Sequence, residues 1–265
     1  MDFFSSLLAS FPSSDADPSW IGVLLGAFLV AVLYSSVGHG GASGYLALLV
    51  LAGFARPEIT PVVLVLNILV ASIGFLSYQR AGHFSSALLV PFVVTSIPAA
   101  FVGGLLAVDD RAYRLILGCA LAAAAVRFLL VPSISARSRA VPARRAREIG
   151  LPVGGVLGLL AGMVGIGGGI FLSPLLLFMG WADARQTAAV SAAFIVLNSS
   201  TGLAAQLLRG GSLDWGLAAP LLAAVAVGGA IGSFLGATRF SLLSLQRLLG
   251  VVLASAGFKL IVELW

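Results

Sequence analysis

The chain has 265 residues, of which 60% are hydrophobic and only 9% are charged, and its formal net charge is +5. Because a soluble domain carries about a quarter charged residues, this composition excludes a soluble globular fold. A third of the fifteen basic residues lie in one short stretch, so the positive-inside tendency of membrane proteins explains the charge without a nucleic-acid partner. These residues are Arg137, Arg139, Arg144, Arg145 and Arg147.

The first eleven residues (MDFFSSLLASF) lack a basic region and hold too short an apolar run for a signal peptide, so we expect them at the membrane interface or flexible. The uncharged stretches that follow could fill eight or more spanning helices of about 20 residues. We therefore predict an all-α polytopic membrane protein. Its parts are an N-terminal tail (1–19), a first membrane repeat (20–131), a basic cytoplasmic linker (132–149) and a second membrane repeat (150–265).

Charge also predicts the topology of the first repeat. No Lys or Arg precedes Arg56, and the tail carries Asp2, Asp15 and Asp17, so the N-terminus is expected outside and the basic linker inside. This requires an odd number of crossings, which we obtain by dividing the first apolar stretch at 38–41. The predicted segments are 20–37, 42–54, 58–78, 84–107 and 112–131. Five crossings make the two repeats inverted, whereas four would make them parallel.

The second half of the chain repeats the first. The sequence VGHGG at 37–41 matches VGIGG at 164–168. Further pairs keep the same order: Gly53-Phe54 with Gly180-Trp181, Arg80-Ala81-Gly82 with Arg209-Gly210-Gly211, and Arg127 with Lys259. A duplication joined by the linker explains this pattern. We interpret Arg127 and Lys259 as side chains that extend to the membrane interface, with a role in anion passage as the alternative.

The matched glycine clusters predict breaks in the first helical pair of each half. Glycine costs a helix about 1 kcal/mol relative to alanine, and freed N–H groups beside a helix N-terminus form a concave anion site. Gly-interrupted segments at corresponding places of two halves are typical of transporter substrate sites. The alternative is close helix packing, which we assign to Gly154-Gly155-xx-Gly158 and Gly228-Gly229-xx-Gly232.

The polar residues near these breaks are neutral or histidine. Every Asp and Glu lies in or near a predicted loop or terminus, which disfavours cation coordination in the membrane. His39 titrates near physiological pH and could bind an anion or carry a coupled proton; its alternative role is to bond loop carbonyls. Asn67 and Asn198 could contact the substrate or, alternatively, form hydrogen bonds between helices. The expected substrate contacts are Gly38, His39, Gly40, Gly41, Ser43, Asn67, Gly165, Gly167, Gly168, Gly169, Asn198 and Ser199.

Enzymatic function is disfavoured, because hydrolysis needs a nucleophile or a metal set and the chain holds two His and one Cys. The same scarcity predicts no bound metal or cofactor and no disulfide. No Walker-type GxxxxGK[ST] sequence occurs, so ATP-driven transport by this chain alone is disfavoured. The remaining classes are a secondary transporter and an anion channel, and both share the features above.

The two glycine motifs, VGHGGASGYLALLVLAG (37–53) and AGMVGIGGGIFLSPLLLFMGW (161–181), resemble those of the sulfite exporter TauE/SafE family. The first motif departs from the pattern at His39 and has Ala47 where the second has Pro174. The resemblance implies transport of sulfite, a sulfonate or a related anion across the bacterial inner membrane, with the anion and the lipid bilayer as partners. It leaves open the direction of transport, the coupling ion and whether the chain forms a homo-oligomer.

Overall fold

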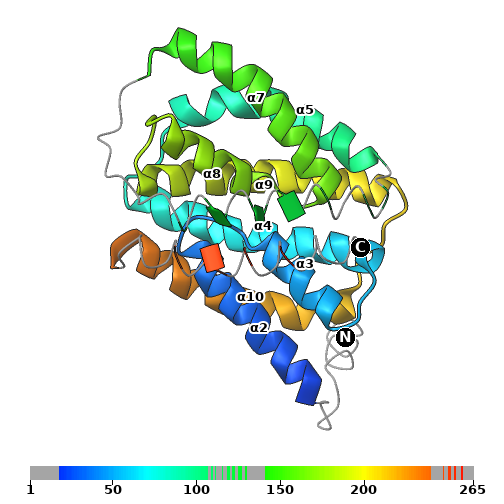
Figure 1. Cartoon of the computed structure of the whole chain (residues 1–265). Coiled ribbons are helices and arrows are strands. Elements are labelled where there is room, and N and C mark those ends of the chain that lie inside the picture. Colours follow the sequence, from blue (N-terminus) through cyan, green and yellow to red (C-terminus); the bar gives the residue numbers. More distant parts are fainter. Residues whose placement is uncertain are drawn as a thin grey trace, which may run out of the picture.

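The computed structural model describes residues 18–106 and 141–239, with single positions between 109 and 129 and between 247 and 258. In this part of the chain all regular structure is helical (Figure 1). The helices are α2 (Pro18–Ser35), α3 (Ala42–Leu51), α4 (Arg56–Arg80), α5 (Ser86–Leu105), α7 (Ala143–Val164), α8 (Gly169–Phe178), α9 (Ala184–Leu208) and α10 (Trp215–Thr238). The predicted all-α fold is confirmed. Arg127, Lys259 and most of segment 112–131 lie outside the described residues.

Five described helices, α4, α5, α7, α9 and α10, are long and apolar enough to cross a membrane. Large apolar side chains lie on the outside of the bundle, among them Leu25, Val94 and Phe234, which are 57%, 58% and 57% exposed. Such a surface is unfavourable in water and suits contact with lipid. Helix starts follow local chemistry, since Asp183 and Asp214 accept hydrogen bonds from N–H groups in the first turns of α9 and α10.

The helices α3 and α8 have 10 residues each. At 1.5 Å per residue they measure about 15 Å, half of a hydrocarbon core of about 30 Å. The prediction that 42–54 forms a full crossing is therefore wrong. Both helices end the same way, because Gly53 and Gly180 adopt left-handed φ values of 94° and 65°, and the next N–H bonds back to the helix.

The basic stretch is partly helical. α7 begins at Ala143, well before the predicted start of the second repeat at 150, and its first turns carry Arg144, Arg145 and Arg147. The run Ala-Arg-Arg-Ala-Arg-Glu consists of strong helix formers directly after Pro142, which explains the early start. Arg144 forms an exposed ion pair with Glu148 at 2.8 Å. Residues 132–140 lie outside the described part.

Two glycine seams join helices from different halves. On α7, glycines lie directly over the backbone of α5, and on α10, glycines lie over the backbone of α2. The residues are Gly150, Gly154, Gly158 and Gly162 on α7, and Gly228, Gly232 and Gly236 on α10. In each seam the partner residue number rises with the glycine number, so the paired helices run parallel. The predicted close packing of the two glycine motifs is confirmed.

Consequently the halves interlock. α5 from the first half packs on α7 and α9, and α10 from the second half packs on α2 and α4. At the centre, α4 and α9 contact each other (Figure 1). Pro61 lies near Gly211, and Tyr78 near Ala188 and Ala189, so these two long helices run antiparallel.

A substitution in the α5–α7 seam is expected to destabilise the fold. An added Cβ at Gly158 would overlap the carbonyl of Ser96 on α5. Such overpacking costs about 1–3 kcal/mol, so Gly158→Ala should lower the melting temperature in detergent by about 5 °C or more. Gly155→Ala is the matched control, because its Cβ would meet only Thr95 at an ordinary 3.8 Å. Equal melting temperatures for the two variants would contradict the close packing of Gly158 against the α5 backbone.

Candidate functional site

The two glycine breaks follow the same backbone path. The first break, 36–41, joins α2 to α3, and the second, 165–168, joins α7 to α8. The N–H groups of His39 and Ile166 each donate to the carbonyl five residues earlier, at 2.8 and 3.3 Å. This shared bond ends the preceding helix in both halves. The predicted division of the apolar stretch at 38–41 is therefore confirmed, and His39 and Ile166 are structural counterparts.

Glycines start both half-length helices. Gly41 and Gly168 occupy the N-cap positions with φ values of 100° and 75°, a left-handed conformation that costs other residues about 1–2 kcal/mol. In the described part of the chain, the N–H groups of Gly40, Gly41, Gly167 and Gly168 donate to no other backbone group. The positive ends of α3 and α8 thus coincide with N–H groups that no backbone carbonyl of the described residues accepts, an arrangement that favours a bound anion.

Asn67 of α4 contacts both breaks. Its Oδ1 accepts a hydrogen bond from the N–H of Ala42 at 3.0 Å, which satisfies the start of α3. Its Nδ2 donates to the hydroxyl of Ser199 on α9 at 2.8 Å and lies 3.5 Å from the carbonyl of Ile166. Asn67 and Ser199 are each 1% exposed. The side chain therefore connects the first break, the second break and the antiparallel helix pair.

His39 links the first break to the second half. Its Nδ1 lies 3.1 Å from the carbonyl of Val37, and its Nε2 lies 3.3 Å from the hydroxyl of Ser173 on α8. Ser173 in turn donates to Ser191 on α9 at 2.7 Å. All three polar side chains are buried. They form a continuous hydrogen-bonded chain across the interface between the halves.

The other predicted residues differ in position. The hydroxyl of Ser43 lies 3.0 Å from that of Tyr34, at the end of α2. Asn198 donates to the carbonyl of Phe194 within its own helix, and its buried Oδ1 has no hydrogen-bond partner among the described residues. Asn67 and Ser199 therefore lie together at the breaks, whereas the hydrogen bond of Asn198 stays within α9.

Residues at the breaks also include three that the sequence did not single out: Tyr34, Tyr45 and Ser191. Tyr34 lies four residues before Gly38, Tyr45 lies four residues after Gly41, and Ser191 accepts a hydrogen bond from Ser173. Spacing of one helical turn from a glycine break could have identified the tyrosines. For Ser191 the sequence carries no comparable signal, since its partner lies on another helix.

Neutral groups surround the breaks. No Asp, Glu, Lys or Arg is buried among the described residues, and no three metal-ligating side chains gather there. The described acidic residues are all exposed: Glu58, Asp109, Glu148, Asp183 and Asp214. N–H groups, hydroxyls, an amide and an imidazole are the available contacts. Such a set can bind an anion through hydrogen bonds without a permanent countercharge.

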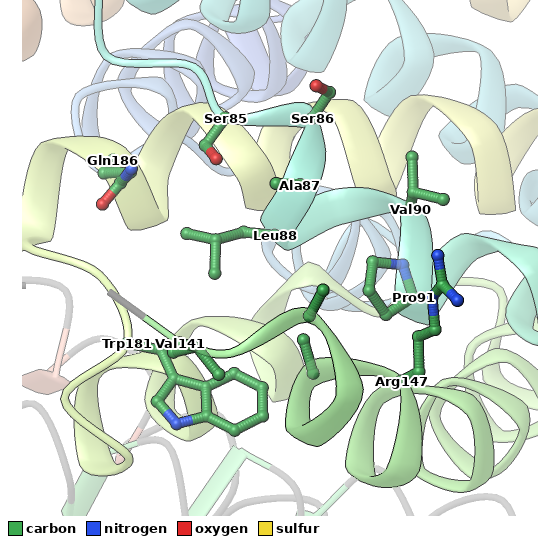
Figure 2. A pocket seen from close by; sticks show the side chains of 12 residues that line it. Ser85, Ser86, Ala87, Leu88, Val90, Pro91, Val141, Arg147, Trp181 and Gln186 are labelled. Carbon is green, nitrogen blue, oxygen red and sulfur yellow. The ribbon is translucent and has the colours of Figure 1, made fainter. Parts of the chain in front are cut away.

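A pocket of about 610 Å³ opens at one end of the bundle. It lies between the starts of α5 and α7 and the loop before α9. Figure 2 shows Arg147 beside Pro91, with Ser85, Gln186 and the indole of Trp181 on the other walls. The pocket combines one cation and several hydrogen-bonding groups with apolar walls, so it can admit an anion.

A smaller pocket of about 370 Å³ lies near the start of α4, lined by Trp20, Leu48 and Phe54 among others. The larger pocket lies beyond the other end of α4, which at 25 residues is about 37 Å long. Trp181 in the larger pocket and Phe54 in the smaller one are matched positions of the two halves. The two pockets therefore occupy corresponding places at opposite ends of the molecule.

Helices with a lipid-facing apolar surface, arranged around two buried helix breaks, define a polytopic membrane protein of the transporter class. The comparison with protein families agrees: the chain belongs to the sulfite exporter TauE/SafE family, which matches residues 23–260. It is thus a multi-pass membrane transporter of this family, as the glycine motifs predicted.

Two relatives support this assignment. The chain is 35% identical over 246 residues to "Probable membrane transporter protein y4hK" of Sinorhizobium fredii, covering 92% of this chain and 99% of the relative. It is 25% identical over 256 residues to "Probable membrane transporter protein YjnA" of Bacillus subtilis, covering 91% and 99%. No solved structure matches the chain.

Proposed function

We propose that the protein is a secondary transporter that carries a small sulfur-containing anion, sulfite or an organosulfonate, across the bacterial inner membrane by alternating access. The observation that carries this proposal is the meeting of two glycine breaks at Asn67, which bonds to Ala42, Ser199 and the carbonyl of Ile166. The family name and the neutral, donor-rich surroundings of the breaks support an anionic substrate. No catalytic step is part of the proposal.

The antiparallel course of α4 and α9 supports inverted repeats. These helices follow the first and second breaks at corresponding places, so the two halves enter the membrane from opposite sides. Inverted repeats provide two alternative states of equal architecture, one open to each side. The pockets at opposite ends of α4 are suitable positions for the two entrances.

Burial at the centre favours a carrier over a channel. His39 and Asn67 are 3% and 1% exposed, so water does not reach these side chains from either pocket. A channel requires a continuous path in its open state, whereas a carrier closes its centre between two open states. The parallel seams α2–α10 and α5–α7 would then move as units against the α4–α9 pair.

His39 is the group we propose for proton coupling. The carbonyl of Val37 can only accept, so His39 carries a proton on Nδ1, while its Nε2 lies 3.3 Å from the hydroxyl of Ser173, which donates to Ser191. A second proton on Nε2 makes this nitrogen a donor toward the Ser173 oxygen. Protonation thus adds a positive charge beside the anion, at the contact between the halves.

Replacing His39 by glutamine is expected to abolish proton-driven accumulation, because glutamine cannot take up the second proton. With native protein a gradient of one pH unit should raise internal anion about tenfold for one coupled proton. His39→Gln should equilibrate the anion without accumulation. His83→Gln is the control, since His83 lies in the turn after α4, away from both breaks. Undiminished accumulation in His39→Gln would contradict this role.

The test of the transport function is uptake into proteoliposomes of radiolabelled sulfite, sulfate and methanesulfonate, each with and without a proton gradient. We expect uptake of sulfite or the sulfonate that saturates with concentration and responds to the gradient. Flux that rises linearly with concentration would instead indicate a channel. Absence of flux for all three anions would overturn the proposed substrate class.

A further inference from the structure

Tyr45 places a phenol at the first break. It lies on α3 one turn after the N-cap Gly41, and side chains in helices lean toward the helix N-terminus. Its ring therefore covers the start of α3: a Cβ added to Gly41 would lie 2.9 Å from Tyr45 Oη. The residue is 0% exposed. The hydroxyl is thus held beside Gly41 at the start of α3.

Within the described part of the chain, the Tyr45 hydroxyl has no hydrogen-bond partner. Two other buried tyrosines behave differently, because Tyr34 pairs with Ser43 at 3.0 Å and Tyr78 donates to the carbonyl of Ser36 at 2.7 Å. Leaving a buried hydroxyl unbonded is unfavourable, and phenylalanine would pack in the same space without this cost. The presence of tyrosine at this position therefore requires an explanation other than packing.

Only one half carries this hydroxyl. The matched position on α8 is Leu172, which is also fully buried and belongs to an apolar cluster. The phenol therefore adds a donor to the first break that the second break lacks. It lies at the N-terminal, positive end of α3, where the N–H groups of Gly40 and Gly41 donate to no backbone carbonyl of the described residues. A charged acceptor is the ligand that this arrangement favours.

We propose that Tyr45 Oη donates a hydrogen bond to an oxygen of the transported anion and so orients that oxygen toward the first break. This inference rests on the proposed function and adds a substrate-contacting residue to it. Because the matched Leu172 cannot donate, the Tyr45 contact is present in the first half alone, and the two breaks hold the anion through different sets of donors.

The test is Tyr45→Phe, which removes the hydroxyl and nothing else. Hydrogen bonds to charged groups are strong enough that affinity for sulfite or methanesulfonate should fall about 10- to 100-fold. Affinity is measured as the KM of proteoliposome uptake and as the anion concentration that raises the melting temperature in detergent. The anion-free melting temperature should stay equal to the native value or rise, because the hydroxyl has no partner to lose.

Ser233→Ala is the control, as it removes a fully buried hydroxyl of α10 that does have a partner, the hydroxyl of Ser77 on α4 at 3.0 Å. It should lower the anion-free melting temperature and leave affinity within about twofold of native. If Tyr45→Phe instead keeps native affinity while native protein transports the anion, the role of Tyr45 is overturned and the transport function stands. If native protein neither transports nor is stabilised by any of the three anions, both proposals fall together.

Discussion

Gly167→Ala is expected to reduce anion transport about 100-fold or more while the protein still inserts into the membrane. Gly167 has a φ of 72°, and an added Cβ would overlap the Ser199 hydroxyl and lie 2.8 Å from Asn67 Nδ2. The methyl group would therefore separate the two side chains that join the breaks. Displacement of site groups by about 1 Å can cost two orders of magnitude in rate, and no larger change in fold is needed.

The matched control for Gly167→Ala is Gly180→Ala. Gly180 has a similar φ of 65°, but no atom lies within 4 Å of its added Cβ. Alanine has the same unfavourable left-handed backbone conformation in both variants, at a cost of about 1–2 kcal/mol. The melting temperature of Gly180→Ala therefore measures the effect of this strain alone. Initial uptake rates in proteoliposomes then report the loss specific to the site. Equal rates for the two variants would remove the second break from the substrate path.

Asn67→Leu should impair both stability and transport. Leucine has a similar volume to asparagine but cannot form the hydrogen bonds by which the amide contacts both breaks. The N–H of Ala42 and the hydroxyl of Ser199 would lose their shared partner, at about 1–3 kcal/mol for each group left unpaired. We expect a lower melting temperature in detergent. Transport should fall about 100-fold, since the two breaks would lose their common support.

Asn198→Leu serves as the control for Asn67→Leu. Asn198 is equally buried, at 1% exposure, but its Nδ2 donates only to the carbonyl of Phe194 in its own helix. The same substitution there removes no contact between helices, so transport should change much less. A loss as large as that of Asn67→Leu would show that Asn198 contributes to the site through its unpartnered Oδ1, as the sequence first suggested.

The glycine breaks are the part of the site that local sequence predicts best. Glycine clusters within an apolar run interrupt a helix wherever the chain goes afterwards, so α3 and α8 begin close to the predicted positions. The repeat of the motif also identified His39 and Ile166 as counterparts, and their backbone hydrogen bonds agree. The helices α4 and α5 follow the predicted segments 58–78 and 84–107 within two residues, because hydropathy is a local property.

The predicted segments differ from the observed helices mainly at the helix ends. Segment 42–54 has enough apolar residues for a longer helix, but the left-handed Gly53 ends α3 at Leu51. In the other direction, α7 extends into the basic stretch because its arginines favour helix and are free to reach water. Hydropathy measures the preference of a segment for lipid, and it carries little information on where backbone hydrogen bonding stops.

Composition and local pattern therefore determine that this chain is a helical membrane protein with two glycine breaks, since both depend on residues adjacent in sequence. Tertiary structure alone decides that α5 and α10 each pack against helices of the other half, and which side chains connect the two breaks. It also decides that the Tyr45 hydroxyl has no partner among the described residues. The contacts of Asn67 with Ser199 and of His39 with Ser173 span 132 and 134 residues of chain. Such pairs depend on the packing of whole helices, which no local pattern encodes.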